Sequence, residues 1–127
     1  MTRTRILIAD SLTIFSSGVR TLLERESDFH VIEAGTYEEV ARVAENECPD
    51  IALIDLDLPP EGGVAAVEKL TELCSCHTIV WSFDPTRETV FAAIRAGASG
   101  YLEKKISPNE IPRNARTSPA GAIFFSR

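Results

Sequence analysis

Short runs of branched apolar residues alternate along the chain with longer segments of helical spacing. The clearest run is Ile51–Ile54, with the turn pair Pro49-Asp50 before it and acidic and turn residues after it. An apolar run of this length between turn signals predicts a strand buried on both faces, as in the centre of a parallel sheet. Further strands are predicted at Arg5–Asp10, Phe29–Ala34, Thr78–Ser82 and Gly100–Leu102.

Amphipathic segments separate these strands. In Leu12–Glu26, one stripe is apolar, whereas Ser16, Arg20 and Glu24 lie outside it, and Ser11 or Thr13 is the expected N-cap. Further helices are predicted from the capping box Thr36–Glu39 to about Asn46, from Gly63 to about Leu73, and from Asp84-Pro85 to Ala96.

The last part of the chain is less regular. A helix is predicted after Ser107, but Pro112 and Pro119 weaken it. The apolar tail Ala122–Phe125 is expected to pack under that helix or to form a partner surface.

The alternation of strand and helix repeats five times without an internal linker. Such units require right-handed crossovers and a parallel sheet with helices on both faces. The sequence therefore predicts a single α/β domain over residues 1–127, a flavodoxin-like (βα)5 three-layer sandwich whose five-stranded sheet has the order 2-1-3-4-5.

Polar residues collect where the predicted strands end. They are Asp10, Asp55, Asp57, Ser82 and Lys104. Carboxyl ends of parallel strands share one edge, where acids suit Mg²⁺ and a serine and a lysine suit phosphoryl oxygens. This constellation predicts a phosphoryl site on Asp55, although a strand end passing into a polar loop is the simpler alternative. A cofactor-binding enzyme is disfavoured, because no glycine-rich phosphate loop follows the first strand.

Composition narrows the class further. The net charge of −6 argues against direct binding to a nucleic-acid backbone, and neither a membrane-length apolar run nor a signal peptide is present. Three cysteines are too few for a disulfide framework, so reduced thiols in a cytoplasmic protein are expected. The segment Cys74-Ser-Cys76-His77 is interpreted as a helix end before a strand rather than as a metal site.

The chain resembles a known family, the receiver domains of bacterial two-component response regulators, and especially the LuxR/NarL type. The motifs are IADSLTIFSSGVR, PDIALIDLDLPPEGG, IVWSFD and AGASGYLEKKISPNEI. The resemblance implies that Asp55 is the phosphoacceptor, Ser82 the switch hydroxyl and Lys104 the phosphate-pairing lysine. It also implies that Pro59 and Gly63 shape the following loop, and that Tyr101 is the switch aromatic, for which a half-buried strand tyrosine is the alternative.

The same resemblance implies partners. A sensor histidine kinase would donate the phosphoryl group, Mg²⁺ would assist, and DNA would be bound only through a C-terminal domain that this chain does not include. The domain would be a switch rather than an enzyme and would form a homodimer. The dimer face is expected either at roughly Pro85–Thr117 or between the first and last helices.

Several residues depart from the family pattern. Ser11 stands where a second acid, the direct metal ligand, is expected; Phe83 replaces a small residue, and Lys105 adds a charge beside Lys104. Asp57 is expected to compensate, giving a shifted metal set of Asp10, Asp55 and Asp57, the last also through its backbone carbonyl. Asp57→Ala should then abolish Mg²⁺ binding. Two classes remain: a phosphoacceptor switch, and a degenerate receiver that binds proteins or ligands without phosphate.

Overall fold

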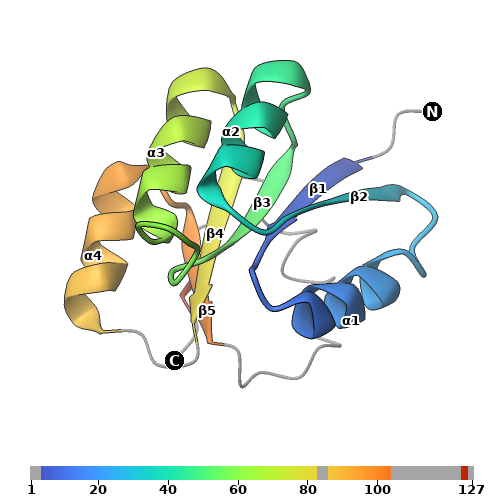
Figure 1. Cartoon of the computed structure of the whole chain (residues 1–127), viewed down its shortest axis with the longest axis horizontal. Helices are drawn as coiled ribbons and strands as arrows, with labels where there is room; N and C mark the ends of the chain where they lie inside the picture. The colour runs from blue at the N-terminus through green and yellow to red at the C-terminus, as the bar shows by residue number, and fades with distance from the viewer. Residues whose placement is uncertain (1–3, 83–85, 104–123, 126–127) are drawn as a thin grey trace.

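The computed structural model describes residues 4–82, 86–103 and 124–125 (Figure 1). Its centre is a parallel sheet in the order β2-β1-β3-β4-β5-β6. The strands are β1 (Thr4–Ala9), β2 (Phe29–Ala34), β3 (Ile51–Asp55), β4 (His77–Ser82), β5 (Gly100–Glu103) and β6 (Phe124–Phe125). The five predicted strands and their order are confirmed. The two-residue β6 was not predicted, and it extends the sheet beside β5.

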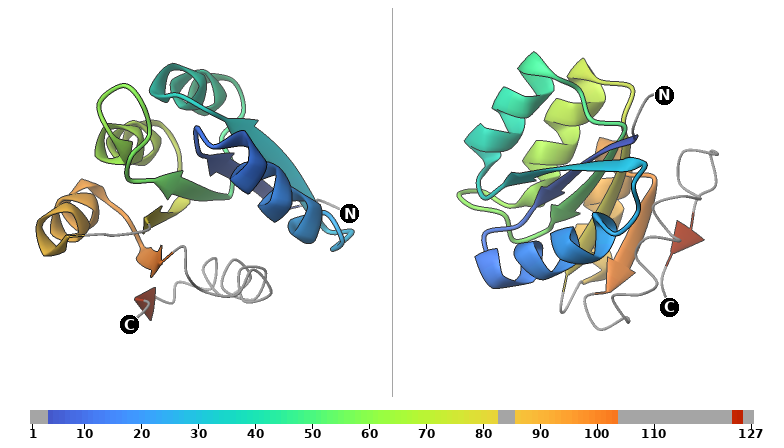
Figure 2. Two further views of the ribbon diagram at one scale, coloured as in Figure 1. Left: turned by 60° about the horizontal axis from the view of Figure 1, so that its bottom comes forward. Right: turned by 90° about the vertical axis from the view of Figure 1, so that its right-hand side faces the viewer.

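Helices cover both faces of this sheet (Figure 2). The helices are α1 (Thr13–Leu23), α2 (Tyr37–Asn46), α3 (Gly63–Leu73) and α4 (Arg87–Ala96). Helices α2, α3 and α4 lie on one face, and α1 lies on the other. The alternation of side chains along β3 divides the core accordingly: Ala52 and Ile54 belong to the cluster with α2, α3 and α4, whereas Ile51 and Leu53 belong to the cluster with α1.

Three helix starts test the capping predictions. Thr36 is confirmed as the cap of α2, because it accepts a hydrogen bond from the Glu39 N–H at 3.2 Å, but the capping box is incomplete, since the Glu39 carboxylate accepts from the Gly35 N–H rather than from that of Thr36. The predicted cap of α1 is wrong: Leu12 is the N-cap, and its N–H donates to the Asp10 carboxylate at 2.8 Å. The predicted start of α4 at Asp84-Pro85 is also wrong, since the N-cap is Thr86, two residues after Asp84, and Thr86 forms a capping box with Thr89.

The cysteines contradict the expectation of three reduced thiols. Cys48 and Cys74 form a disulfide, with their Cα atoms 5.6 Å apart, and only Cys76 of the three is free. The prediction failed because 26 residues separate the pair in sequence, and the packing of α2 beside α3 brings them together. The interpretation of residues 74–77 as a helix end before a strand is confirmed, since α3 ends at Leu73 and β4 begins at His77.

Candidate functional site at the carboxyl end of the sheet

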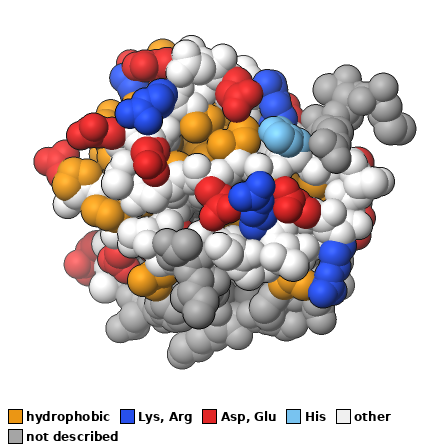
Figure 3. All heavy atoms as spheres, turned by 45° about the vertical axis from the view of Figure 1, so that its right-hand side comes forward, with side chains coloured by type: hydrophobic (Ala, Val, Ile, Leu, Met, Phe, Trp, Pro, Cys, Tyr) orange, Lys and Arg blue, Asp and Glu red, His pale blue; other side chains and the backbone are white. Residues whose placement is uncertain are grey.

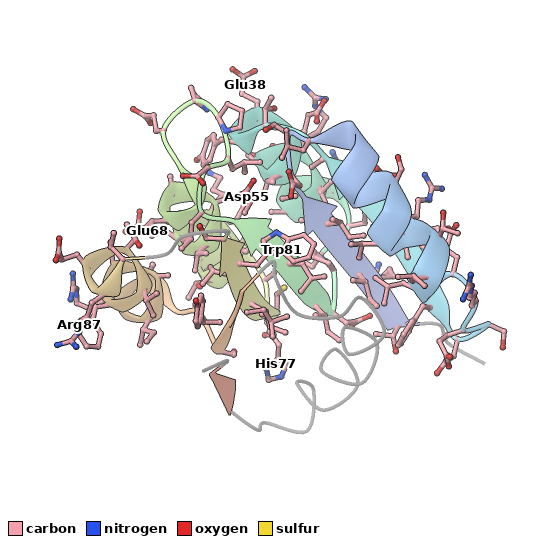
Figure 4. The ribbon with its side chains drawn as sticks, turned by 90° about the horizontal axis from the view of Figure 1, so that it is seen from below. Glu38, Asp55, Glu68, His77, Trp81 and Arg87 are labelled. Carbon is pink, nitrogen blue, oxygen red and sulfur yellow. A yellow bond between two sulfur atoms is a disulfide. The ribbon has the colours of Figure 1, made fainter. Side chains whose placement is uncertain are left out.

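Asp55 is the last residue of β3 and lies at the centre of the sheet's carboxyl-terminal edge (Figure 4). Every residue of β3 is buried, and Asp55 itself is only 3% exposed. Its carboxylate accepts a hydrogen bond from the Asp57 N–H at 2.9 Å. A buried carboxylate is unfavourable unless it has partners or a chemical role, so this position is a strong candidate for function.

The loop after Asp55 is held tightly against it. The Leu58 N–H donates to the Asp55 carbonyl oxygen at 3.1 Å, and the Pro59 carbonyl accepts from the Tyr37 N–H of α2 at 2.9 Å. Gly63, the first residue of α3, packs so closely that an added Cβ would lie 2.2 Å from the Asp55 carbonyl oxygen. Only glycine fits there, so α3 begins directly beside the candidate phosphoacceptor.

Asp10 lies next to Asp55 in the sheet. Ala9 of β1 is in register with Ile54 of β3, so the next residues along the two adjacent strands are Asp10 and Asp55. Strand alternation starts both on the face that carries α1, and Asp10 is 3% exposed. Ser11, where the second acid is expected, is exposed. Two buried carboxylates therefore meet at this edge of the sheet.

The predicted position of Asp57 requires a correction. We expected strand alternation to place its side chain on the same face as Asp55, but β3 ends at Asp55 and Asp57 lies in the following turn, with its side chain exposed. Within residues 4–82, 86–103 and 124–125, no group of three His, Cys, Asp or Glu side chains is arranged to hold a metal ion. The described geometry thus brings together two carboxylates rather than three.

The predicted hydroxyl and aromatic lie on neighbouring strands. Trp81 is in register with Asp55, and Ser82 follows it at the end of β4 with 4% exposure. Tyr101 of β5 is 8% exposed and belongs to the same hydrophobic cluster as Val80, its register partner, on the face of α3 and α4. By alternation, Ser82 and Tyr101 start on the same face of the sheet. Phe83, Lys104 and Lys105 lie outside the described residues.

A small cavity adjoins Asp10 and was not predicted. It has a volume of about 210 Å³ and is lined by Asp10, Ser11, Ser16, Glu33, Ala34, Gly35 and Glu39. Ser16 was expected outside the apolar stripe of its helix, but it is 2% exposed and its hydroxyl donates to Glu33 at 3.0 Å. The sequence of α1 alone could not predict the burial of Ser16, because its hydrogen-bond partner, Glu33, lies on β2.

On the side of β2 and α1, the exposed charges of the described residues are of both signs. Figure 3 shows acidic and basic side chains interspersed there. Arg20 of α1 bonds Glu33 at 2.7 Å and Glu24 at 3.3 Å, and the hydrogen bond to Glu33 is the largest factor raising the pKa of the guanidinium. These contacts are exposed and solvent-screened, so they shape the surface more than they stabilise the fold.

Comparison with known proteins agrees with the fold. A parallel sheet in the order β2-β1-β3-β4-β5, with one buried carboxylate directly after its first strand and another at the end of its third, defines a flavodoxin-like domain. The model of the response regulator receiver domain family matches residues 6–116, and the chain belongs to this family.

Individual relatives place the chain within the family. It is 32% identical over 123 residues to the nitrate/nitrite response regulator protein NarL of Escherichia coli K12, covering 95% of this chain and 57% of NarL. A LuxR-family two-component response regulator from Aurantimonas has a similar structure, with a TM-score of 0.88, 29% identity, and coverage of 97% of this chain and 89% of that chain. A CheY-like receiver from Methanospirillum hungatei JF-1 also has a TM-score of 0.88, with 28% identity and coverage of 94% and 95%. The chain is a response regulator receiver domain similar to those of NarL and of LuxR-family regulators, and it spans little more than half of NarL.

Proposed function

We propose that this receiver domain accepts a phosphoryl group on Asp55 and thereby switches its interaction surface. The observation that carries the proposal is the burial of the Asp55 carboxylate at the end of the central strand, with the second buried carboxylate, Asp10, next to it in register. Phosphorylation on aspartate is typical of the family.

The two carboxylates also fit a magnesium ion. Receiver domains generally bind Mg²⁺, and Mg²⁺ is usually held by one or two carboxylates together with waters and phosphoryl oxygens. Asp10 and Asp55 would supply the carboxylates, and Asp57 would contribute its backbone carbonyl rather than its exposed side chain. When bound, the ion would neutralise charge on the phosphoryl oxygens.

Three residues of the chain would carry out the phosphoryl transfer and hold its product. A carboxylate oxygen of Asp55 attacks phosphorus, a new O–P bond forms, and the bond from phosphorus to the donor histidine nitrogen breaks as that nitrogen keeps the electron pair. The Ser82 hydroxyl would donate to one phosphoryl oxygen and Lys104 would pair with another. Because such catalysis is mostly positioning and electrostatics, the burial of Asp55 matters more than any separate acid or base.

Phosphorylation would be read out on the α4 side of the sheet. The added group carries roughly −1.5 to −2 charges, and movement of Ser82 towards it would open space beside Tyr101, which starts on the same face. We place the domain in a cytoplasmic regulator that receives the group from a sensor histidine kinase, dimerises, and binds DNA through a C-terminal domain as NarL-type proteins do. In the described part of the chain, none of the helices has the length and apolarity to cross a membrane.

The test is intact mass after incubation with acetyl phosphate and Mg²⁺. One phosphoryl adduct is expected on the wild-type chain and none on Asp55→Asn, whereas Asp50→Asn, a change at the opposite end of β3, should behave like wild type. Trp81, buried and in register with Asp55, should report the reaction as a change in fluorescence. An adduct that persists in Asp55→Asn would show that another residue is the acceptor.

The exposed Ser11 favours a second candidate. With no acid at that position the pocket has one carboxylate fewer than the family pattern, which favours a degenerate receiver that binds a protein or ligand without phosphate. The absence of both an adduct and a Mg²⁺-dependent change in Trp81 fluorescence would select this function over the first.

A further inference from the structure

The Cys48–Cys74 disulfide lies at the end of the sheet opposite Asp55. Cys48 lies between the end of α2 at Asn46 and the start of β3 at Ile51, and Cys74 is the C-cap of α3. Their Cα atoms are 5.6 Å apart. The bridge therefore ties the connection into the central strand to the end of the helix that begins beside Asp55.

Both bridge cysteines lie among exposed positions of the chain. Each is half-buried, and the flanking residues Glu47, Leu73 and Ser75 are exposed. Neither cysteine is within a helix or a strand, so opening the bridge breaks no hydrogen bond of the sheet. The backbone bonds nearby are separate from it: the Cys74 N–H donates to Leu70 at 2.8 Å, and the His77 N–H donates to Asp50 at 3.0 Å.

Cys76, the free cysteine, is a poor nucleophile for disulfide exchange with this bridge. Cys76 is only two residues from Cys74 and, like Cys74, packs against the hydrophobic cluster between the sheet and α2, α3 and α4, but its thiol donates to the His77 carbonyl oxygen at 3.8 Å. Burial raises the pKa of its thiol to about 12. Since the thiolate is the nucleophile in disulfide exchange, Cys76 remains a poor competitor for either bridge sulfur.

We propose that Cys48 and Cys74 form a reversible redox site that fixes the end of α3 when oxidised and releases it when reduced. A dithiol reductant supplies the two electrons: one of its thiolates attacks a bridge sulfur, the S–S bond breaks, and its second thiol resolves the mixed disulfide. The products are two protein thiols and an oxidised reductant; a low-molecular-weight disulfide reverses the reaction by the same steps. The expectation of reversibility rests on the proposed cytoplasmic setting, where protein disulfides are usually transient or redox-sensing.

The experiment equilibrates the folded full chain with dithiothreitol or with oxidised glutathione and counts thiols after an acid quench and alkylation in denaturant. We expect three thiols per chain after reduction and one after oxidation, with the remaining thiol mapped to Cys76 by peptide mass. The midpoint of thermal unfolding should fall by roughly 10 °C on reduction, because the unfolded chain regains the entropy that the closed loop removes. In the folded oxidised chain, Cys76 should be alkylated on the order of a hundredfold more slowly than after unfolding.

Variants separate this site from general effects of the reagents. The Cys48→Ser/Cys74→Ser chain should show the lower midpoint in both conditions, and Cys76→Ala should keep the redox dependence of wild type. Asp55→Asn should also keep it, so the inference stands or falls independently of phosphorylation. Three thiols after oxidation, a bridge that opens only in denaturant, or a bridge that includes Cys76 would each overturn the proposal; the wild-type comparison alone decides the matter if the double variant does not fold.

Discussion

The two ends of the sheet are built in opposite ways. At the carboxyl end, polar groups are buried: Asp10, Asp55 and Ser82 are each at most 4% exposed. At the amino end, the Asp50 carboxylate is exposed and accepts from the Arg5 N–H at 2.8 Å, and the Cys48–Cys74 bridge lies close by. The carboxyl end thus contains buried polar side chains, whereas the amino end contains a disulfide and a side-chain hydrogen bond that join neighbouring segments.

This difference shows which end of the sheet can hold buried reactive side chains without unfolding the domain. Buried carboxylates persist only where the surrounding structure holds them, since their desolvation disfavours the folded state. Here the apolar strands between the two ends, with Ile51, Leu53 and Ile54 fully buried, and the tethered amino end provide that support. Substitutions at the carboxyl end should therefore alter phosphoryl chemistry, whereas substitutions at the amino end should alter stability alone.

The largest effect is expected for Gly63→Ala. The new methyl group would meet the Asp55 carbonyl oxygen at 2.2 Å, a contact with backbone that cannot be relieved by turning a side chain. We expect a loss of about 3 kcal/mol in the free energy of unfolding, together with slower adduct formation, because the loop after Asp55 must move. Urea unfolding and intact mass with acetyl phosphate measure the two effects.

Gly18→Ala is the matched control. Gly18 lies inside α1, and an added Cβ would meet nothing within 4 Å. This change should stabilise the helix by about 1 kcal/mol and leave adduct formation unchanged. Equal effects of the two substitutions would show that the packing of α3 against Asp55 has no special role.

Much of the fold was predictable because each strand carries its own signal. Ile51–Ile54 is apolar and branched on both faces, and the acids that follow it mark the carboxyl end at which Asp55 is found buried. Likewise Thr36 and Glu39 show the start of α2 within four residues. These features depend on local sequence, so they can be predicted without knowing what packs against them.

The errors arose where a distant residue decides the outcome. The buried hydroxyl of Ser16 donates a hydrogen bond to Glu33 on β2. Cys48 forms a disulfide with Cys74 because α2 packs beside α3. Asp57 was misplaced for a different reason: the alternation was extended two residues past Asp55, where the strand has already turned. Thus the burial of Asp55 at the carboxyl end followed from the sequence, whereas the exposed side chain of Asp57 did not.

Ser11→Asp sharpens the comparison by adding an acid at the carboxyl end. The new carboxylate would stand beside Asp10, and we expect Mg²⁺ to bind roughly tenfold more tightly, since the charge of the ligand set governs affinity for hard cations. Isothermal titration with MgCl₂ measures the change. Ser17→Asp is the control, because it adds the same charge on an exposed position of α1 and should leave the affinity unaltered. If both substitutions raised the affinity for Mg²⁺ equally, the effect would come from the net charge of the domain and not from a ligand at residue 11.

The smallest effect is expected at the amino end, for Asp50→Ala. The substitution removes the acceptor of the Arg5 N–H and a 3.9 Å ion pair between two exposed side chains. The ion pair contributes little, so the lost hydrogen bond should account for a decrease of about 1 kcal/mol in the free energy of unfolding. Asp50→Asn retains an oxygen acceptor and should lose less than half as much. Both variants should form the phosphoryl adduct at the wild-type rate, because the amino end is separated from Asp55 by the whole length of β3. A slower rate in Asp50→Ala, with stability otherwise as expected, would mean that the two ends are coupled and that a tether at one end can tune chemistry at the other.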